Sequence, residues 1–577
     1  MPEQTGRSQL FSKRRLRFTM SETQRFLLLA LLIGVFAALL VVCFHIVIDF
    51  ISWSSLGTLT DRFRFKRLIP PTLGALAALV LVRRFFRAAQ GSGVNQTKAA
   101  LYISDGYVPA STVVGKFVAC SVAIGTGNSL GPEDPALQMG AGIASLVGRS
   151  FRLQRESMRL IAPMGAAAGI AAAFNTPIAG VLFVMEEIVD AWNAGVVSSI
   201  LLASVSAVVV ARWFLGDQPI FHVPAFELIH PSELLVYAAV GLVGGLLSVL
   251  YVRSIELLRE RLDRLPKWSR YVQAPAAGFL IGCFGLWLPQ VMGAGYPAID
   301  SALHNQFPWP MLLSLGLVKM VATWLCFSAG VPGGMFAPTL FIGAMIGGGL
   351  GGVAHQYWPF PTSPPDAYAL VGIGTFFAGI FRAPMTSIFM TFEVSGNYVV
   401  ILPAMVANIV SYFVSRWLYP TPFFTMLAKQ EGVDLPSAEE RRSIPILRVE
   451  DALRPGNSTV LRSNTPIARA LEEVEKTGRD HSLVERAGGK WSWISRKALS
   501  ELVRDSNGNQ TLEQGIELPL LPWVYPDLPL DVALRLLGSY PLLPVTDRAH
   551  PERLLGTLTL EDVHHAYGIS CPPQASR

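Results

Sequence analysis

The stretch GNSLGPEDPALQMG at positions 127–140 places two adjacent carboxylates, Glu133 and Asp134, between two prolines. Long apolar segments flank this stretch, and an ionisable residue inside a membrane costs roughly 2.5–3.5 kcal/mol on insertion scales. A helix that begins here would stabilise a carboxylate through its dipole. We expect Glu133 to occupy an anion site itself and to leave it when protonated or displaced; the alternatives are a helix cap or a surface loop. Asp134, directly before Pro135, is better explained as a helix cap.

The composition indicates a membrane protein. The 577 residues are 51% hydrophobic and 15% charged, with a mean hydropathy of +0.42, which departs far from soluble averages. Several segments are long and apolar enough to cross a bilayer: 26–51, 198–215, 234–252 and 311–327. Other apolar segments are shorter and interrupted by Gly or Pro.

The net charge of +6 does not indicate nucleic-acid binding, because the basic residues lie beside membrane segments. A basic cluster at 7–17 precedes the first span and favours a cytoplasmic N-terminus, although DRFRFKR at 61–67 would then lie on the opposite side. We expect a multi-pass protein of a bacterial inner membrane with both termini cytoplasmic. The five cysteines have no metal or disulfide spacing, so we expect no metal.

Near residue 430 the long apolar segments end, and the composition becomes that of an ordinary soluble domain. We expect a cytoplasmic segment at 1–23, a transmembrane domain at 24–430 and a cytoplasmic tail at 431–577. In the tail, strand-like and helix-like segments alternate. The strand-like ones are 458–463, 541–547 and 553–560, and the helix-like ones are 466–478 and 529–539.

An internal repeat runs through the apolar part, with repeats at about 24–215 and 232–427. Six residues of the first repeat recur at a constant offset of about 203 positions, as from 131 to 334. The residues Lys116, Gly131, Pro135, Gly140, Ala141 and Gly148 recur as Lys319, Gly334, Pro338, Gly343, Ala344 and Gly351. In a second block, Gly165, Phe174, Pro177 and Glu186 recur as Gly372, Phe381, Pro384 and Glu393. Small residues coincide in any Gly-rich membrane protein, but the Lys, Pro and Glu matches argue against coincidence. Counting does not tell parallel from inverted repeats.

Two repeats with interrupted segments at corresponding positions are typical of secondary transporters, which bind their solute between the repeats. Half-helix N-termini present free N–H groups and a positive dipole end, so several that converge form an anion site. The backbone N–H groups of Met335 and Phe336 are candidates for it. Glu186 has a repeat partner and is predicted to be structural. Glu187 faces a valine in the other repeat and is a candidate for proton entry or, alternatively, for a plain solvated helix end.

These motifs together resemble the CLC family of chloride channels and chloride/proton antiporters. The resemblance rests on GSGV at 91–94, G-x-E-x-P at 131–135, GGMFAP at 333–338, AAAFNTPIAGVLFVMEE at 171–187 and FRAPMTSIFMTFE at 381–393. It implies an all-α polytopic membrane domain built as an inverted repeat of broken, tilted helices. It also implies a homodimer with a separate anion pathway in each subunit.

By position, the resemblance implies specific roles. Ser92 corresponds to the central chloride-coordinating serine, and Glu133 to the gating glutamate at the external mouth. Met335 and Phe336 correspond to backbone donors to chloride. Glu187 corresponds to the internal glutamate that passes protons in the antiporters. Its presence favours antiport, and a serine at position 92 favours chloride.

The sequence also departs from the family pattern. Asn95 stands where the family has proline, and Pro132 and Asp134 replace a basic residue and a glycine, which removes one positive charge and adds a negative one beside the gating glutamate. The central tyrosine of the family falls at Phe424, or at Phe423 in the other register, so the ring is kept and its hydroxyl is lost.

The tail resembles a pair of CBS modules, at about 447–503 and 521–567, which makes it an α/β unit. In the second module, Thr559 and Asp562 would bond the phosphate and ribose of a nucleotide, whereas residues 495–498 of the first lack the Asp. We therefore expect a structural or dimerising tail, with adenine-nucleotide binding as the less favoured alternative and no other cofactor.

The sequence predicts a chloride/proton antiporter, not an enzyme, whose partners are chloride, protons, lipid and a second copy of the chain. The alternative is a passive chloride channel gated by voltage or pH. A nucleotide sensor and an organic-anion permease are weaker hypotheses.

Overall fold

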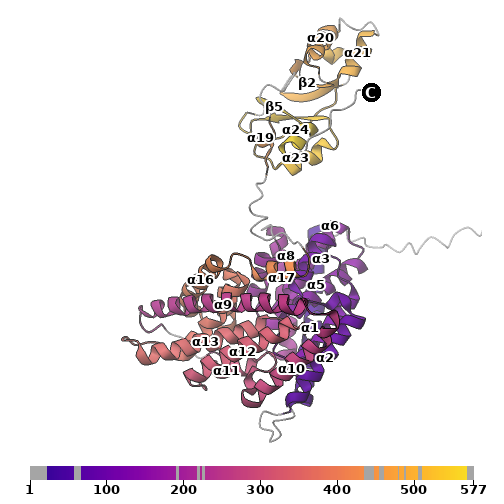
Figure 1. Cartoon of the computed structure of the whole chain (residues 1–577). Coiled ribbons are helices and arrows are strands. Elements are labelled where there is room, and N and C mark those ends of the chain that lie inside the picture. The colour runs from indigo at the N-terminus through magenta and orange to yellow at the C-terminus, as the bar shows by residue number, and fades with distance from the viewer. Residues whose placement is uncertain are drawn as a thin grey trace, which may run out of the picture. The chain divides into compact units, whose positions relative to one another are not determined.

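The computed structural model describes residues 22–57, 67–189, 194–216, 221, 223, 228–433, 447–453, 460–478, 480–486, 489–504, 510–516, 518–550 and 552–567. The chain divides into two compact units, Met1–Arg441 and Arg442–Arg577. Figure 1 shows the elements of both units. The basic cluster at 7–17 lies outside the described residues, as do residues 61–66.

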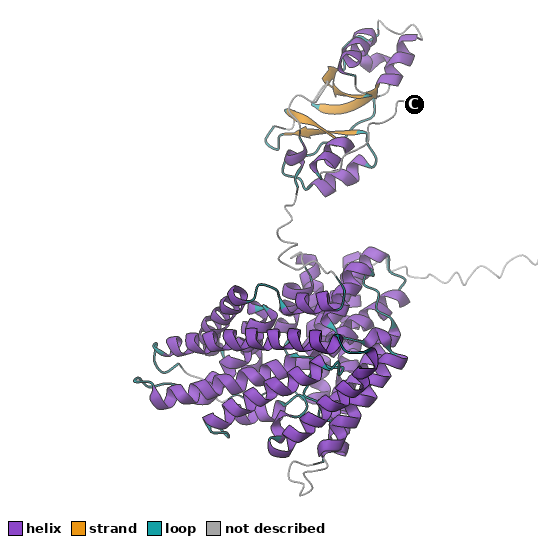
Figure 2. Cartoon of the chain, viewed as in Figure 1, coloured by secondary structure: helices purple, strands orange, loops and turns teal. Residues whose placement is uncertain are grey.

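The first unit is helical wherever it has regular structure (Figure 2). Its first half contains α1 Glu22–Leu56, α2 Ile69–Val80, η2 Leu81–Phe85, η3 Arg87–Ala89, α3 Val94–Ile103, α4 Ala110–Gly125, α5 Glu133–Ser150, α6 Arg155–Phe174, α7 Pro177–Phe183, η4 Val184–Ile188 and α8 Ala194–Leu215. Its second half contains α9 Glu233–Asp263, η5 Lys267–Ser269, α10 Arg270–Trp287, η6 Pro289–Val291, α11 Tyr296–Leu303, α12 Trp309–Ser328, α13 Phe336–Tyr357, α14 Pro365–Phe381, α15 Pro384–Ser395, η7 Tyr398–Val400, α16 Ile401–Leu418 and α17 Phe423–Gln430.

The long apolar segments form the expected spans. Within the described residues, seven helices are long and apolar enough to cross a membrane. The four segments predicted from hydropathy lie inside α1, α8, α9 and α12. These helices carry apolar residues on most of their circumference, as a bilayer requires. The chain is thus an integral, multi-pass membrane protein.

The two halves of the unit use glycines in the same way. A Cβ on Gly140 of α5 would lie 2.1 Å from the carbonyl oxygen of Gly165 on α6, and a Cβ on Gly343 of α13 would lie 2.2 Å from that of Gly372 on α14. Gly140 and Gly343 are repeat partners, and so are Gly165 and Gly372. Small residues let helix backbones approach closely in a membrane, so the repeat in the sequence is a repeat in helix packing.

Repeat partners also contact each other reciprocally. The N–H of Gly131 donates to the carbonyl of Gly334 at 2.8 Å, and the N–H of Gly334 donates back to Gly131 at 2.7 Å, in an antiparallel bridge. The two repeats therefore contact each other through equivalent residues.

The tail unit contains two similar halves. Its elements are α19 Val449–Ala452, β1 Val460–Arg462, α20 Ile467–Thr477, β2 His481–Arg486, β3 Lys490–Ser495, α21 Arg496–Arg504, α22 Leu512–Gly515, α23 Leu530–Leu537, β4 Leu542–Thr546, β5 Leu554–Thr559 and α24 Leu560–Ala566. In the first half, β1 pairs parallel with β2, and β2 antiparallel with β3. In the second, Val524 bridges Val545 in parallel, and β4 pairs antiparallel with β5. The strands and helices predicted in the tail are confirmed, but β2 and β3 were not predicted.

Candidate functional site

Helices α5 and α13 begin next to each other in the interior of the first unit. The bridge between Gly131 and Gly334 lies just before both helices and fixes their starts side by side. The first N–H groups of a helix have no partner within it. The backbone therefore brings free donors and two positive dipole ends to one buried point, which is an anion site in physical terms.

Glu133 is the first residue of α5, as expected from the sequence, and is fully buried. Its Oε2 accepts a hydrogen bond from the N–H of Ala337 at 3.2 Å, and its Oε1 accepts one from the hydroxyl of Tyr296. Ala337 lies in the first turn of α13, and Tyr296 is the first residue of α11. The carboxylate thus occupies donors that a bound anion would use.

Asp134 is also fully buried, but it does not cap its own helix. Its Oδ2 accepts a hydrogen bond from the N–H of Met335 at 2.7 Å, so it caps α13 from across the bridge. The sequence predicted a cap of the helix that begins beside Asp134, and this was wrong, because the residue caps the neighbouring helix. The reason is geometric, since Asp134 is the second residue of α5 and its side chain reaches the helix start that faces it. One predicted chloride donor, the Met335 amide, is bonded to Asp134.

Ser92 and Phe336 are two further predicted chloride ligands, and both are buried. Ser92 stands between Gly91 and Gly93, whose φ angles of +87° and +130° give the loop a shape that side chains disfavour. Within the described part of the chain, the Phe336 N–H donates no backbone hydrogen bond. This donor is available to a ligand, and the Ser92 hydroxyl remains a candidate beside it.

Aromatic rings fill the space on one side of this point. The Phe336 ring packs against Phe183 and Phe381, with centroids 4.9 and 4.8 Å apart. Phe424 stacks on Phe381 at 5.3 Å and meets Phe183 edge-on at 6.4 Å. Closely packed rings leave a dry region, which any proton that moves between Glu133 and the far side must cross.

The carboxylate of Glu187 is connected to these rings through Lys98. It is in the π-helical turn η4 and forms an ion pair with the ammonium of Lys98. The Lys98 Nζ also lies 5.7 Å from the centroid of the Phe424 ring. One chain of contacts thus runs from Glu133 through the start of α13 and the rings to Glu187.

The two candidates for the central aromatic residue have different surroundings. The Phe424 ring contacts Lys98 and Phe183, whereas the contacts of Phe423 include Phe327. Asn95, which replaces a proline of the family pattern, donates from Nδ2 to the carbonyl of Phe424 at 2.9 Å. The departure at position 95 therefore ties α3 to the start of α17.

Sequence reasoning missed Tyr296 and Lys98. Tyr296 follows GAG at 293–295, which stands in the second repeat where GSG at 91–93 stands in the first. That correspondence was a usable signal. Lys98 gave none, because a lysine four residues into α3 resembles an ordinary helix-surface residue.

The repeated charged residues make equivalent contacts in the two repeats, and those of Glu186 agree with its predicted structural role. Glu186 accepts hydrogen bonds from the N–H groups of Met385 and Thr386 at 3.1 and 2.9 Å, and its partner Glu393 accepts from Ile178 and Ala179 at 2.8 and 2.7 Å. These donors are themselves repeat partners. The equivalent lysines behave alike, since Lys116 donates to the carbonyl of Gly91 and Lys319 to that of Gly293.

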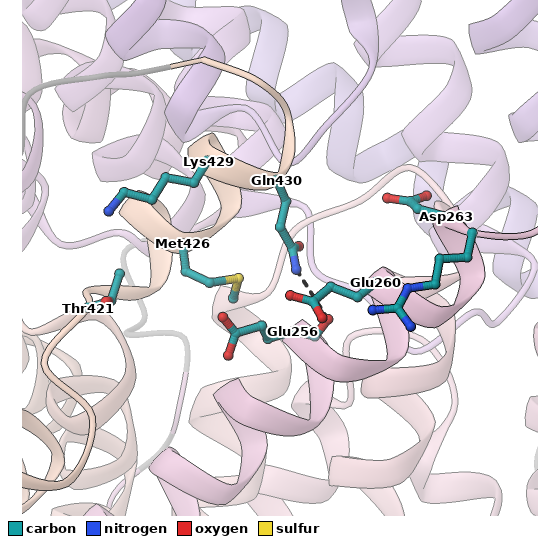
Figure 3. A pocket seen from close by; sticks show the side chains of 8 residues that line it. Glu256, Glu260, Asp263, Thr421, Met426, Lys429 and Gln430 are labelled. Carbon is teal, nitrogen blue, oxygen red and sulfur yellow. Dashed lines mark hydrogen bonds between the residues drawn. The ribbon is translucent and has the colours of Figure 1, made fainter.

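A cavity of about 540 Å³ lies elsewhere, between the end of α9 and α17 (Figure 3). Its charged lining consists of three carboxylates and two cations: Glu256, Glu260, Asp263, Arg264 and Lys429. An excess of negative charge disfavours a bound anion. This cavity is therefore not the chloride site.

In the tail, Thr559 and Asp562 bond to each other. Asp562 Oδ2 accepts from the N–H and hydroxyl of Thr559 at 3.0 and 2.6 Å, and the Thr559 hydroxyl accepts from the Asp562 N–H at 3.3 Å. This is a capping box at the start of α24. The pair has a structural role that needs no nucleotide.

Known proteins resemble the first unit closely. A family model described as voltage gated chloride channel matches residues 74–416. The putative chloride channel protein ClcB-like of Ralstonia nicotianae is 32% identical over 60% of this chain and 82% of its own length. The H(+)/Cl(-) exchange transporter ClcA of Vibrio cholerae is 30% identical over 70% of this chain and 88% of its own length.

A solved structure agrees with these relatives. The crystal structure of a slow cyanobacterial Cl⁻/H⁺ antiporter superimposes with a TM-score of 0.65 at 26% identity, over 70% of this chain and 98% of the other. The similarity covers nearly the whole of that protein. Its fold is therefore the fold of the first unit.

Proposed function

Because this chain belongs to the voltage gated chloride channel family, we propose that it exchanges chloride for protons across a membrane. The protein is a transporter and not an enzyme. The bonds from Ala337 and Tyr296 to Glu133 support this proposal most directly. They put a removable, protonatable anion on the donors of an anion site.

Exchange follows from competition for one site. When Glu133 is deprotonated, its carboxylate accepts the hydrogen bond from the Ala337 amide, so chloride cannot bind that donor. When it takes up a proton it loses its charge, and chloride can replace it beside Phe336 and Ser92. Glu187 supplies the proton from the other side of the rings. Chloride and proton thus alternate, and a gradient of either drives the other.

Reconstitution in liposomes tests the proposal. With a chloride gradient imposed and internal pH recorded, we expect chloride efflux to drive protons inward against their gradient. Chloride movement without proton movement would rule out exchange, and no chloride movement would rule out the wider proposal. Empty liposomes provide the baseline.

The variant Glu133→Gln separates the two ions. A neutral amide cannot carry a proton, so proton movement should fall to the baseline while chloride flux continues. The control is Glu260→Gln, which neutralises a carboxylate of the acidic cavity and should leave both fluxes unchanged. Retained proton movement in Glu133→Gln would contradict the assigned role.

The second candidate is a passive chloride channel. The ion pair between Lys98 and Glu187 favours a channel. A carboxylate that is paired with an ammonium group takes up a proton less readily, and the exchange scheme needs Glu187 to carry one. The missing hydroxyl at Phe424 points the same way. The liposome measurement decides between the candidates, since a channel moves chloride without protons.

The proposal extends to the orientation of the repeats, the oligomeric state, the membrane and the side on which the termini lie. We expect an inverted repeat, a homodimer with one pathway in each subunit, a bacterial inner membrane and cytoplasmic termini. The order β1-α20-β2-β3-α21 in the first half of the tail, and a bridge at Val524 followed by α23-β4-β5-α24 in the second, support a CBS pair. Calorimetry on the full-length protein with ATP tests nucleotide binding, and mass photometry in detergent tests the dimer.

A further inference from the structure

The site contains a second buried carboxylate that the exchange scheme does not use. Glu133 and Asp134 take the N–H groups of Ala337 and Met335, at 3.2 and 2.7 Å. Between these two amides lies the N–H of Phe336. Three consecutive donors of α13 therefore have their outer two members bonded to carboxylates.

Asp134 is held much more firmly than a swinging gate would be. A Cβ on Gly334 would lie 2.9 Å from the Asp134 Cγ and 3.0 Å from its Cβ, so the carboxyl group lies directly over that glycine. Asp134 is 0% exposed, and the reciprocal bridge between Gly131 and Gly334 fixes the backbone beneath it. Its side chain also has one rotatable bond fewer than that of Glu133.

The second oxygen of this carboxylate has no partner in the described part of the chain. Asp134 Oδ1 is buried without a hydrogen bond. A side chain present only as a helix cap would not need to bury an unpaired oxygen, which is costly. Its position at the row of amides places a carboxyl group where an anion would bind.

We propose that Asp134 is a positioning residue that keeps chloride off the Met335 amide and so sets the chloride affinity of the site. This inference rests on the proposed function. While Asp134 stays in place, chloride that displaces Glu133 gains the Phe336 and Ala337 amides and the Ser92 hydroxyl, but it does not gain Met335. It also meets a like charge one residue away.

Substitution at position 134 tests the inference. In Asp134→Gly the Met335 N–H becomes free and the charge is gone, so chloride should bind about ten- to a hundredfold more tightly, the range for a hydrogen bond to a charged acceptor. Asp134→Asn keeps an acceptor for Met335 but removes the charge, so its affinity should lie between those of Asp134→Gly and the wild type. Calorimetry on the full-length protein in detergent measures the affinity.

Controls separate this inference from the proposed function. Asp105→Asn removes the same charge from a turn with φ of +49°, a conformation that asparagine accepts, and should bind chloride as the wild type does. A wild-type protein that moves no chloride in liposomes would overturn both proposals. A wild type that transports, with Asp134→Asn and Asp134→Gly at wild-type affinity, would overturn the inference alone. If Asp134→Gly does not fold, Asp134→Asn decides, because tighter binding supports the inference and unchanged binding contradicts it.

Discussion

Two neighbouring carboxylates contact different donors of one site, because their side chains differ in length. Glu133 meets the third amide of the row and the hydroxyl of Tyr296, whereas Asp134 meets the first amide and packs on Gly334. The sequence predicted that Glu133 lies at a helix start and that Asp134 is a cap. It pointed to the helix that begins beside Pro135, which was wrong, because the helix that Asp134 reaches depends on how α5 packs against α13.

The Tyr296 hydroxyl should hold Glu133 in place. In Tyr296→Phe the carboxylate loses one donor, so chloride should displace it more easily and flux should rise by about tenfold or more, since a hydrogen bond to a charged group contributes roughly 1.5–3 kcal/mol. Chloride efflux from liposomes at fixed pH measures this. The matched control is Tyr398→Phe, at an exposed tyrosine, and an unchanged rate in folded Tyr296→Phe would refute the role.

Helices α7 and α15 illustrate how far sequence reasoning reaches at the scale of elements. The repeat identified Pro177 and Pro384 as equivalent positions, and it predicted that Glu186, which recurs as Glu393, is structural. The contacts agree, but each glutamate caps the other helix rather than its own. A repeat in sequence identifies equivalent residues, and only the folded chain brings the partners together.

Loss of these caps should affect stability rather than transport. Glu186 accepts two N–H bonds and the Thr386 hydroxyl at 2.6 Å, while Glu393 accepts two N–H bonds. Glu186→Ala should reduce the free energy of unfolding by about 1–2 kcal/mol, and Glu393→Ala by somewhat less. Thermal unfolding in detergent measures the order of stability.

The transport readout provides the contrast for this prediction. The proton-to-chloride ratio should stay at the wild-type value in both variants, because neither carboxylate lies on the path from Glu133 to Glu187. An altered ratio in a folded Glu186→Ala protein would assign that residue to the proton route. Glu260→Ala on α9 should change neither stability nor ratio by much.

At the scale of the whole molecule, every residue proposed for exchange lies in the first unit. Ser92, Glu133, Glu187, Phe336 and Phe424 all precede Arg441, where that unit ends. The cyanobacterial antiporter is covered over 98% of its length by 70% of this chain. A protein of that smaller extent is named as an antiporter, so exchange does not require an added unit of the kind found here.

A chain truncated after residue 433 should therefore still exchange chloride for protons. We expect the full-length ratio of protons to chloride, because coupling arises where Glu133 competes with chloride for one row of amides. The transport rate of the truncated protein should differ from that of the full-length protein only if the tail regulates transport. Parallel liposome assays of truncated and full-length protein measure both quantities, with Asp562→Ala in the full chain as a control that weakens the tail by loss of one helix cap. A truncated protein that folds but moves chloride without protons would place part of the coupling in the tail.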